Sequence, residues 1–301
     1  MKTTAKQFTV FGNIGLVQLR MEPETTFRFM PGGPEMKNGR LIISESMESG
    51  VVGKLIAMNN TDSFLLLTDA DVLIGAKQNR IINRSMLLAP NSKTIIDVSC
   101  IERLRWHYTD KNFSSPGSTA DHDLRKAKAA SMSFKRKEAG EPAPDTQGTV
   151  WSHISNRMSE EKFFEKTESY HAMASFHQSM KAAEFPVCEP EKGCNGIAVV
   201  SDGKVQCIDI FGNEEVYNYY FPLLRDSAFR MAVEGKNVKS PDMHEAYYKV
   251  LDTLDNYETA DRKPAEAYVG SGSLIMAEND ISIGLDLTIN DQLIHRAVFV
   301  K

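Results

Sequence analysis

Short apolar runs separated by turn signals dominate the first hundred residues of the chain. Strand-like runs rich in leucine, isoleucine, valine and phenylalanine occur at residues 8–11, 15–21, 41–44, 51–58, 64–67, 72–74, 80–88 and 94–101. Glycine, proline and asparagine lie between them, as in Pro31-Gly32-Gly33-Pro34. Short strands at such regular spacing are typical of antiparallel sandwiches and barrels. The pattern therefore predicts a β-rich domain over residues 1–108.

A basic segment follows, which we interpret as a partly flexible connecting arm over residues 109–148. Residues 124–137 include six lysines and arginines and no acidic residue. Runs of like charge are usually solvated faces, so we expect an exposed helix with flexible ends. The alternative is an arm that binds phosphate or nucleic acid.

The last part of the chain, residues 149–301, begins with helical spacing. Apolar residues three and four positions apart predict core-facing helices over 151–158 and 170–180. Ser240-Pro241-Asp242 marks another helix start, with Ser240 as the N-cap and Pro241 at the first helical position. Asn213 is expected to cap a helical region that Pro222 interrupts.

Strands are expected in this part as well. Asp202-Gly203 suits a type I′ turn and predicts a hairpin between residues 196–200 and 204–211. Apolar residues alternate from 281 to 289, and a second strand returns over 293–300. We therefore expect an α+β fold. In it, an N-terminal antiparallel β-sandwich or barrel-like half precedes a mixed helix and β-hairpin half that packs on it.

Composition narrows the class of protein. Of the 301 residues 42% are hydrophobic and 25% charged, as in ordinary soluble globular proteins. The net charge of -5 argues against a general nucleic-acid binder. The chain has neither an apolar run of roughly 20 residues nor the apolar core of a signal peptide, so we expect a cytoplasmic protein without a membrane partner. The four cysteines form no C-x-x-C pair, which predicts free thiols and no metal site.

The most unusual stretch lies between two predicted strands and reads Gly75-Ala76-Lys77-Gln78-Asn79-Arg80, followed by Asn83. Gly75 permits a positive φ or a close backbone approach. Lys77 and Arg80 are suited to phosphate or carboxylate. Gln78 and Asn79 can read an amide, a ribose or a base edge. These residues are our candidate ligand site.

An extended backbone would divide this candidate site. Lys77 and Asn79 would share one face of a strand, while Gln78 and Arg80 would share the other, unless a bulge intervenes. The alternative interpretation is a buried polar network or a subunit contact. The sequence leaves the two interpretations open.

Several polar residues near predicted strand ends are candidates for chemistry. Glu102 can act as a general acid or base, or pair with Arg80 or Lys77. Trp106 can stack on a nucleobase. Asp209, on the apolar face of a strand, is either a catalytic or binding acid or a cap for the next helix, and we favour the cap. His295 is expected to be packed and hydrogen-bonded rather than catalytic.

The residues of the candidate site also resemble a known family. The run from Gly75 to Arg80, with Asn83 and the segments 98–102 and 105–106, resembles the ARPP-1 domain, the ADP-ribosylglycohydrolase and rhodanese-phosphatase-superfamily-associated protein domain. The resemblance continues through residues 124–125, 147, 150–151, 209–211 and 223–224, ends near Gly270, Gly272 and His295, and so covers most of the chain. It implies a role near ADP-ribose, NAD-derived nucleotides or phosphoesters, by association alone.

Two functions from different classes remain open. In the first, the chain binds or processes an ADP-ribose or NAD-derived nucleotide or phosphoester, with Glu102 or Asp209 as acid or base. In the second, it is a non-enzymatic assembly or adaptor domain, forms a homo-oligomer and uses the polar block as a structural or interface network. The sequence names no cofactor and does not decide whether the chain is an enzyme. Nucleic acid is the less favoured partner.

Overall fold

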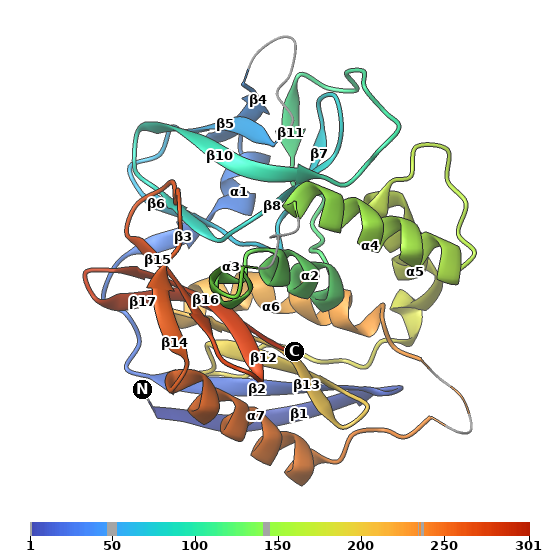
Figure 1. Cartoon of the computed structure of the whole chain (residues 1–301), viewed down its shortest axis with the longest axis vertical. Coiled ribbons are helices and arrows are strands. Elements are labelled where there is room, and N and C mark those ends of the chain that lie inside the picture. The colour runs from blue at the N-terminus through green and yellow to red at the C-terminus, as the bar shows by residue number, and fades with distance from the viewer. Residues whose placement is uncertain (1, 47–52, 141–144, 234, 236–237) are drawn as a thin grey trace.

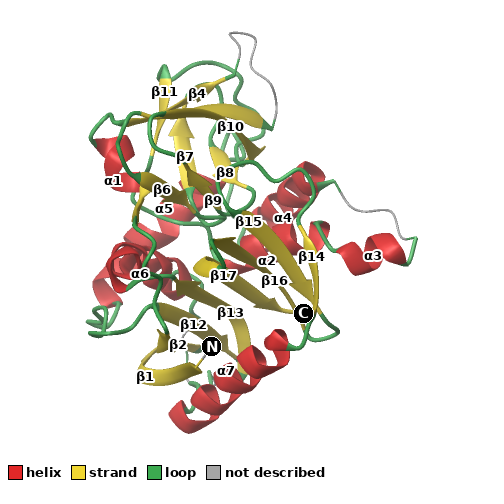
Figure 2. Ribbon diagram, turned by 90° about the vertical axis from the view of Figure 1, so that its left-hand side faces the viewer, coloured by secondary structure: helices red, strands yellow, loops and turns green. Residues whose placement is uncertain are grey.

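The computed structural model describes residues 2–46, 53–140, 145–233, 235 and 238–301. Within these residues, the largest sheet is antiparallel and has the strand order β1-β2-β12-β13-β17-β16-β15-β14 (Figures 1 and 2). The strands of this sheet are β1 (Lys2–Phe11), β2 (Ile14–Glu22), β12 (Gly196–Ser201), β13 (Lys204–Phe211), β14 (Asp261–Pro264), β15 (Ser273–Glu278), β16 (Ser282–Ile289) and β17 (Gln292–Val300).

Strands from the beginning and from the end of the chain lie in this sheet. Strand β2 pairs with β12, so that Ile14 lies opposite Ser201. The expected hairpin between β12 and β13 is confirmed, and Asp202 and Gly203 both have the positive φ that a type I′ turn requires. Residues 1–108, expected as one β-rich domain, contribute strands to this sheet and to the two others.

The other two sheets lie above the large sheet in Figure 1. One is a closed barrel in the order β10-β5-β4-β11-β7-β8, which confirms the barrel-like N-terminal half. Its strands are β4 (Leu41–Glu45), β5 (Lys54–Asn59), β7 (Val72–Gly75), β8 (Arg80–Ile82), β10 (Ser92–Cys100) and β11 (Asn112–Ser114). The third sheet consists of β3 (Phe29–Pro31), β6 (Phe64–Leu67) and β9 (Met86–Leu88).

Two sequence expectations need comment here. The run over residues 80–88 is not one strand, because the chain leaves the barrel after β8 and joins the three-stranded sheet as β9. Residues 51–52 of another expected strand, and residues 141–144 of the expected arm, lie outside the described residues.

Helices α6 (Glu214–Phe229) and α7 (Met243–Glu258) cover opposite faces of the large sheet (Figure 1). Tyr217 and Phe221 of α6 belong to the apolar core that includes Phe211 of β13. Val250 of α7 packs with β2 on the other face. Each helix buries one stripe, which is why an amphipathic sequence forms it.

Both helices correct details of the prediction. Pro222 lies inside α6 and does not interrupt it, because packing of the helix on the sheet outweighs the missing backbone hydrogen bond. Asn213 caps α6 as expected. The N-cap of α7 is Asp242 instead of Ser240, since the hydroxyl of Ser240 donates to the carbonyl of Gly12.

The remaining helices are α1 (Gly32–Lys37), α2 (His122–Ser131), α3 (Phe134–Glu138), α4 (Thr146–Glu160), α5 (Tyr170–Lys181) and a 3₁₀ turn, η1 (Ala182–Glu184). Ile154 of α4 and Met173 of α5 pack against Ile81 of the barrel. Phe176 and Met180, expected in the core, are instead 48% and 63% exposed, because only one side of α5 faces the barrel. No helix in the described part of the chain is long and apolar enough to cross a membrane.

Candidate functional site

A tight turn between β7 and β8 carries the first predicted site. Gly75 and Ala76 have φ values of 118° and 42°. A Cβ on Gly75 would lie 2.8 Å from the carbonyl oxygen of Asn112, so both its conformation and its surroundings require glycine. Residues 76–79 therefore form a turn between β7 and β8. An extended backbone, which would point successive side chains to opposite faces of a strand, is absent there.

This turn brings Asn79 and Glu102 together around Arg105. The side-chain oxygen of Asn79 accepts from Gly75 N and from Arg105 Nη2, each at 3.1 Å. Asn79 N donates to Glu102 Oε2 at 3.2 Å, and Arg105 Nε donates to the same oxygen at 2.8 Å. Thr167 donates to the other Glu102 oxygen. We call these residues, with the turn, the rim network.

The rim network keeps Glu102 ionised. Burial alone would raise the pKa of this carboxyl, but Arg105, the Asn79 N–H and the Thr167 hydroxyl together lower it below its usual value. The sequence suggested Arg80 or Lys77 as a partner of Glu102, and the structure shows an ion pair with Arg105. Arg105 lies three residues further along the chain, and the two charged groups are 2.7 Å apart.

Gln78 and Arg80 point into the protein, while Lys77 and Trp106 lie nearer its surface. Arg80 is fully buried, and its Nη1 donates to the side chain of Gln78 at 3.1 Å. Burial lowers the pKa of Arg80. Lys77 Nζ lies 5.4 Å from the ring centre of Trp106 and 5.2 Å from that of Tyr108. The guanidinium of Arg80 lies 6.0 Å from the same Trp106 ring centre, so Lys77 and Arg80 approach one aromatic side chain from different depths.

Asp209 belongs to a second buried group, which we call the joint cluster. Arg125 of α2 donates to both carboxylate oxygens of Asp209, at 2.8 and 2.5 Å, and to Asp69 at 2.9 and 3.0 Å. His295 lies 3.2 Å from Asp209 through Nε2 and 2.8 Å from the Ser85 hydroxyl through Nδ1. His295 is thus packed and hydrogen-bonded, as expected.

Two expectations about the joint cluster are wrong. Asp209 does not cap α6, because Arg125 takes both of its oxygens and Asn213 is the cap. The basic helix is not simply a solvated face, since Arg125 and Lys128 are only 2% and 1% exposed. They turn inward because Asp69 and Asp209 offer carboxylates and the chain offers free carbonyls there.

Electrostatics in the joint cluster follow from burial and pairing. Burial raises the pKa of Asp209, but Arg125 and His295 outweigh it and hold this pKa well below its usual range. Burial lowers the pKa of Lys128 to about 7. Its Nζ donates to the carbonyls of Asp69 and Ile82, both at 2.6 Å.

The joint cluster contains a set of groups that could coordinate a cation. One ligand atom each from Asp69, Asp209 and His295 lie within 4.8 Å of one another. The same carboxylate oxygens accept hydrogen bonds from Arg125. A metal ion would therefore have to displace the guanidinium group, which already supplies the positive charge.

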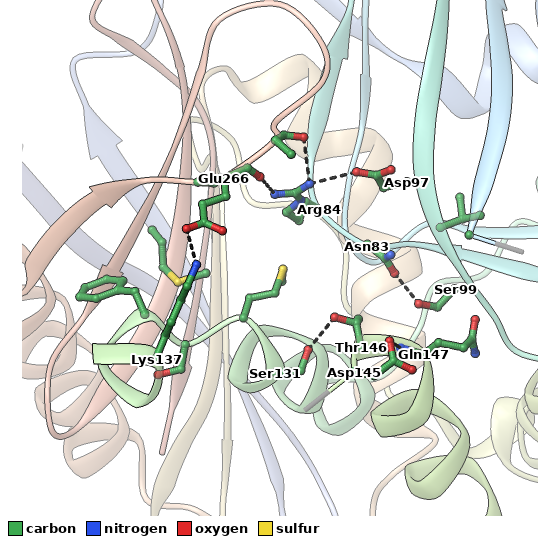
Figure 3. Close-up of a pocket in the computed structure, with 18 of the residues that line it drawn as sticks. Asn83, Arg84, Asp97, Ser99, Ser131, Lys137, Asp145, Thr146, Gln147 and Glu266 are labelled. Atoms are coloured by element: carbon green, nitrogen blue, oxygen red, sulfur yellow. Dashed lines mark hydrogen bonds and ion pairs between the residues drawn. The ribbon is translucent and has the colours of Figure 1, made fainter. Parts of the chain in front are cut away.

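A candidate binding site is the pocket between the barrel, helices α2 to α4 and strands β14 and β15 (Figure 3). Its volume is about 970 Å³. Of the predicted ligand residues, Asn83 lines it and accepts a hydrogen bond from Ser99 at 2.7 Å. Ser131 and Thr146 face each other across the floor at 2.9 Å.

Charged and apolar groups complete this pocket. Arg84 donates to Asp97 at 3.0 Å and to the carbonyl of Glu266 at 2.6 Å. Lys137 lies 2.6 Å from the carboxylate of Glu266. The apolar part of the lining consists largely of Val98, Met132, Phe134, Pro264, Ala265, Ala267 and Met276. The pocket thus offers apolar surface, neutral hydrogen-bonding groups, three cations (Arg84, Lys137 and Lys263) and three carboxylates (Asp97, Asp145 and Glu266).

Comparison with known families agrees with the resemblance in the sequence. The family model described as ARG and Rhodanese-Phosphatase-superfamily-associated Protein domain, ARPP-1, matches residues 2–299. The chain belongs to the ARPP-1 family. Neither a curated protein nor a solved structure matches it. Residues by which the sequence resembles this family lie in both buried groups: Asn79 and Glu102 in the rim network, and Arg125, Asp209 and His295 in the joint cluster.

Proposed function

We propose that this ARPP-1 chain binds a phosphoester derived from a nucleotide, of the ADP-ribose type, in the pocket of Figure 3. The observation that carries the proposal is a cavity of about 970 Å³ whose lining combines apolar side chains, neutral polar groups and cations that are paired with exchangeable carboxylates. Small-molecule sites are typically concave, largely apolar, and contain a few convergent polar groups. A nucleotide presents the same three kinds of surface as base, ribose and phosphate.

Lys137 is the residue best placed to exchange its partner for a phosphate. Its side chain is 61% exposed and that of Glu266 is 80% exposed. An ion pair between such exposed groups contributes little net free energy, so an incoming phosphate can compete for the lysine. Arg84 is less available, because Asp97 and the carbonyl of Glu266 already take its donors.

Neutral groups on the opposite wall suit a base or a ribose. The amide nitrogen of Asn83 can donate while its oxygen accepts from Ser99. The hydroxyls of Ser131 and Thr146 can both donate and accept. Family membership supports the ligand class only through the association that the family name records.

Catalysis by Glu102 or Asp209 stays a prediction, as does ligand binding by Gly75, Lys77, Gln78, Asn79, Arg80 and Trp106. Each carboxylate is held ionised by an arginine. Either residue would have to lose that partner before it could accept a proton in a reaction. For this reason the proposal is limited to binding.

Thermal unfolding with ADP-ribose, ADP and adenosine tests the proposed function. A ligand at about 100 times its Kd stabilises the folded state by about 2.7 kcal/mol, which shifts Tm by several degrees. We expect Lys137→Ala to reduce the shift given by ADP-ribose and ADP but not that given by adenosine. Asn83→Ala should reduce all three shifts.

Lys249→Ala is the matched control, because Lys249 pairs with Glu245 on α7 and does not line the pocket. It should leave all three ligand shifts unchanged. If none of the ligands stabilises the folded wild-type protein, the proposal is wrong.

An assembly or adaptor role is the second candidate, and the rim network favours it. There Asn79, Glu102 and Arg105 hydrogen-bond to one another within the chain, as expected of a structural element. Leu104, Trp106 and Tyr108 beside it are 62%, 47% and 48% exposed. A mass that rises with concentration in light scattering, and falls back in Trp106→Ser, would support this role. A monomer at all concentrations would contradict it.

A further inference from the structure

Helix α3 forms one wall of the pocket but is attached to the protein in an unusual way. The pocket lining includes Phe134 and Lys137 of this helix. None of its described residues is fully buried. In Figure 2 it projects from the body of the molecule beside β14. Its attachment therefore depends on contacts at its two ends.

The N-terminal end of α3 is held by a buried carboxylate. Glu278 of β15 is 1% exposed, and it accepts from the Ser133 hydroxyl at 2.6 Å and from Lys135 N at 3.3 Å. Lys301 also donates to it at 2.8 Å. Hydrogen bonds to a buried charged acceptor are stronger than those between neutral groups. This end of the helix is therefore a fixed point.

The rest of α3 is held by Phe134, which packs against the apolar core, and by side chains at the protein surface. Among the described residues, it makes ion pairs from Lys135 to Asp261, from Lys137 to Glu266 and from Glu138 to Lys263. Most of these side chains are about half exposed or more. Lys263 also lies 5.0 Å from the ring centre of Phe134. Exposed pairs are weak and are screened by salt.

We propose that α3 is a hinged lid on the pocket, with the Ser133–Glu278 contact as its hinge and the surface ion pairs as its latch. Breaking the Lys137–Glu266 pair releases the side of the lid that borders the pocket. The lid's part in ligand entry rests on the proposed function, whereas its opening is a property of the chain itself. A phosphate bound to Lys137 would replace Glu266 and hold the lid from inside.

Native-state proteolysis measures the opening without any ligand. The helix contains consecutive trypsin sites at Lys135, Arg136 and Lys137. Cleavage of a folded protein requires local opening, so its rate reports the open population. We expect the cleavage rate at these sites to rise several-fold between low and high salt, after correction with an unstructured peptide substrate.

Glu266→Gln removes the pocket-side part of the latch. It should raise the cleavage rate in α3 by two- to fivefold at low salt and reduce the salt dependence. Glu245→Gln is the matched control, since it breaks another surface ion pair, with Lys249, on α7. It should leave cleavage in α3 unchanged.

An unchanged cleavage rate in Glu266→Gln, or an equal rise of this rate in Glu245→Gln, would contradict the lid proposal. A second arm adds saturating inorganic pyrophosphate, which should slow cleavage in α3 if the phosphate holds the lid from inside. Salt-dependent opening without this protection would support the lid and count against the proposed function. The two ideas can therefore fail separately.

Discussion

The rim network and the joint cluster each place a buried arginine between acceptors, but they connect different parts of the chain. The acceptors of Arg105 lie between Gly75 and Thr109, in one turn and the loop that follows the next barrel strand. Those of Arg125 lie on Asp69 and Asp209, and the group extends to His295. The first organises a local turn, whereas the second joins the barrel side of the molecule to the large sheet through α2.

This difference should appear in how far the effect of a substitution extends through the structure. Loss of Arg105 leaves the buried carboxylate of Glu102 without its main partner, in a region that can open locally. Loss of Arg125 removes the guanidinium partner of Asp69 and of Asp209, which lie in different layers, at the same time. Removing one partner of a buried ion pair is far more costly than the pair is worth, because the remaining charge stays desolvated.

The largest expected effect comes from Arg125→Met, which keeps the length of the side chain and removes its charge. We expect the free energy of unfolding to fall by at least about 3–5 kcal/mol, the cost of an uncompensated buried charge. Urea denaturation measures it. Lys126→Met, which changes a less buried neighbour on α2, should cost under about 0.5 kcal/mol. Equal losses in the two variants would contradict the joint role of Arg125.

A smaller and more local effect is expected from Arg105→Met. The loss should be about 2 kcal/mol, since one buried carboxylate loses a charged donor while Asn79 and Thr167 still donate to it. Hydrogen exchange should rise in residues 75–79 and 102–109 more than in the large sheet. If hydrogen exchange rose equally over the whole protein, the rim network would instead stabilise the fold as a whole.

The effect confined to one range of pH should be a difference in pH dependence in Lys128→Met. The folded-state pKa of Lys128, about 7, lies below its ordinary value of 10.5, so between these values the unfolded chain binds more protons. Wild-type stability therefore gains a contribution as pH rises above 7, and the variant lacks it. Urea curves at several pH values between 7 and 9.5 should show a widening gap. If the free energy of unfolding changed with pH in the same way in both proteins, this prediction would be wrong.

Much of the fold and the rim network could be predicted from the sequence because they depend on near neighbours. The alternation of apolar and polar residues, together with turn residues, located the strands. Strand β8, which follows Asn79, pairs with β10, the strand that leads to Glu102. The buried faces of Asp209 and His295 also signalled that both needed partners. The identity of the salt-bridge partner, Arg105 instead of Arg80, depended on the turn geometry and was missed.

The joint cluster and the pocket could not be predicted, because both form where separate layers meet. Arg125 lies in a run of basic residues whose pattern matches a solvated helix face. Only the position of α2 between Asp69 and Asp209 distinguishes Arg125 from its exposed neighbours. The pocket likewise is lined by residues from two distant stretches of the chain, 53–147 and 263–276. No pattern in either stretch indicates that the two meet in the folded protein.

The pairing of β2 with β12 has a consequence for synthesis of the chain. Strand β2 ends at Glu22, but its neighbour in the sheet starts only at Gly196. At a translation rate of about 5–20 residues per second, the first hairpin waits on the order of ten seconds or more for that neighbour. During this time the barrel can fold while one edge of β2 stays unpaired. Pairings between strands so distant in sequence form slowly, and an unpaired edge invites aggregation. We therefore expect refolding yield to fall with protein concentration more steeply than for a barrel that closes on itself.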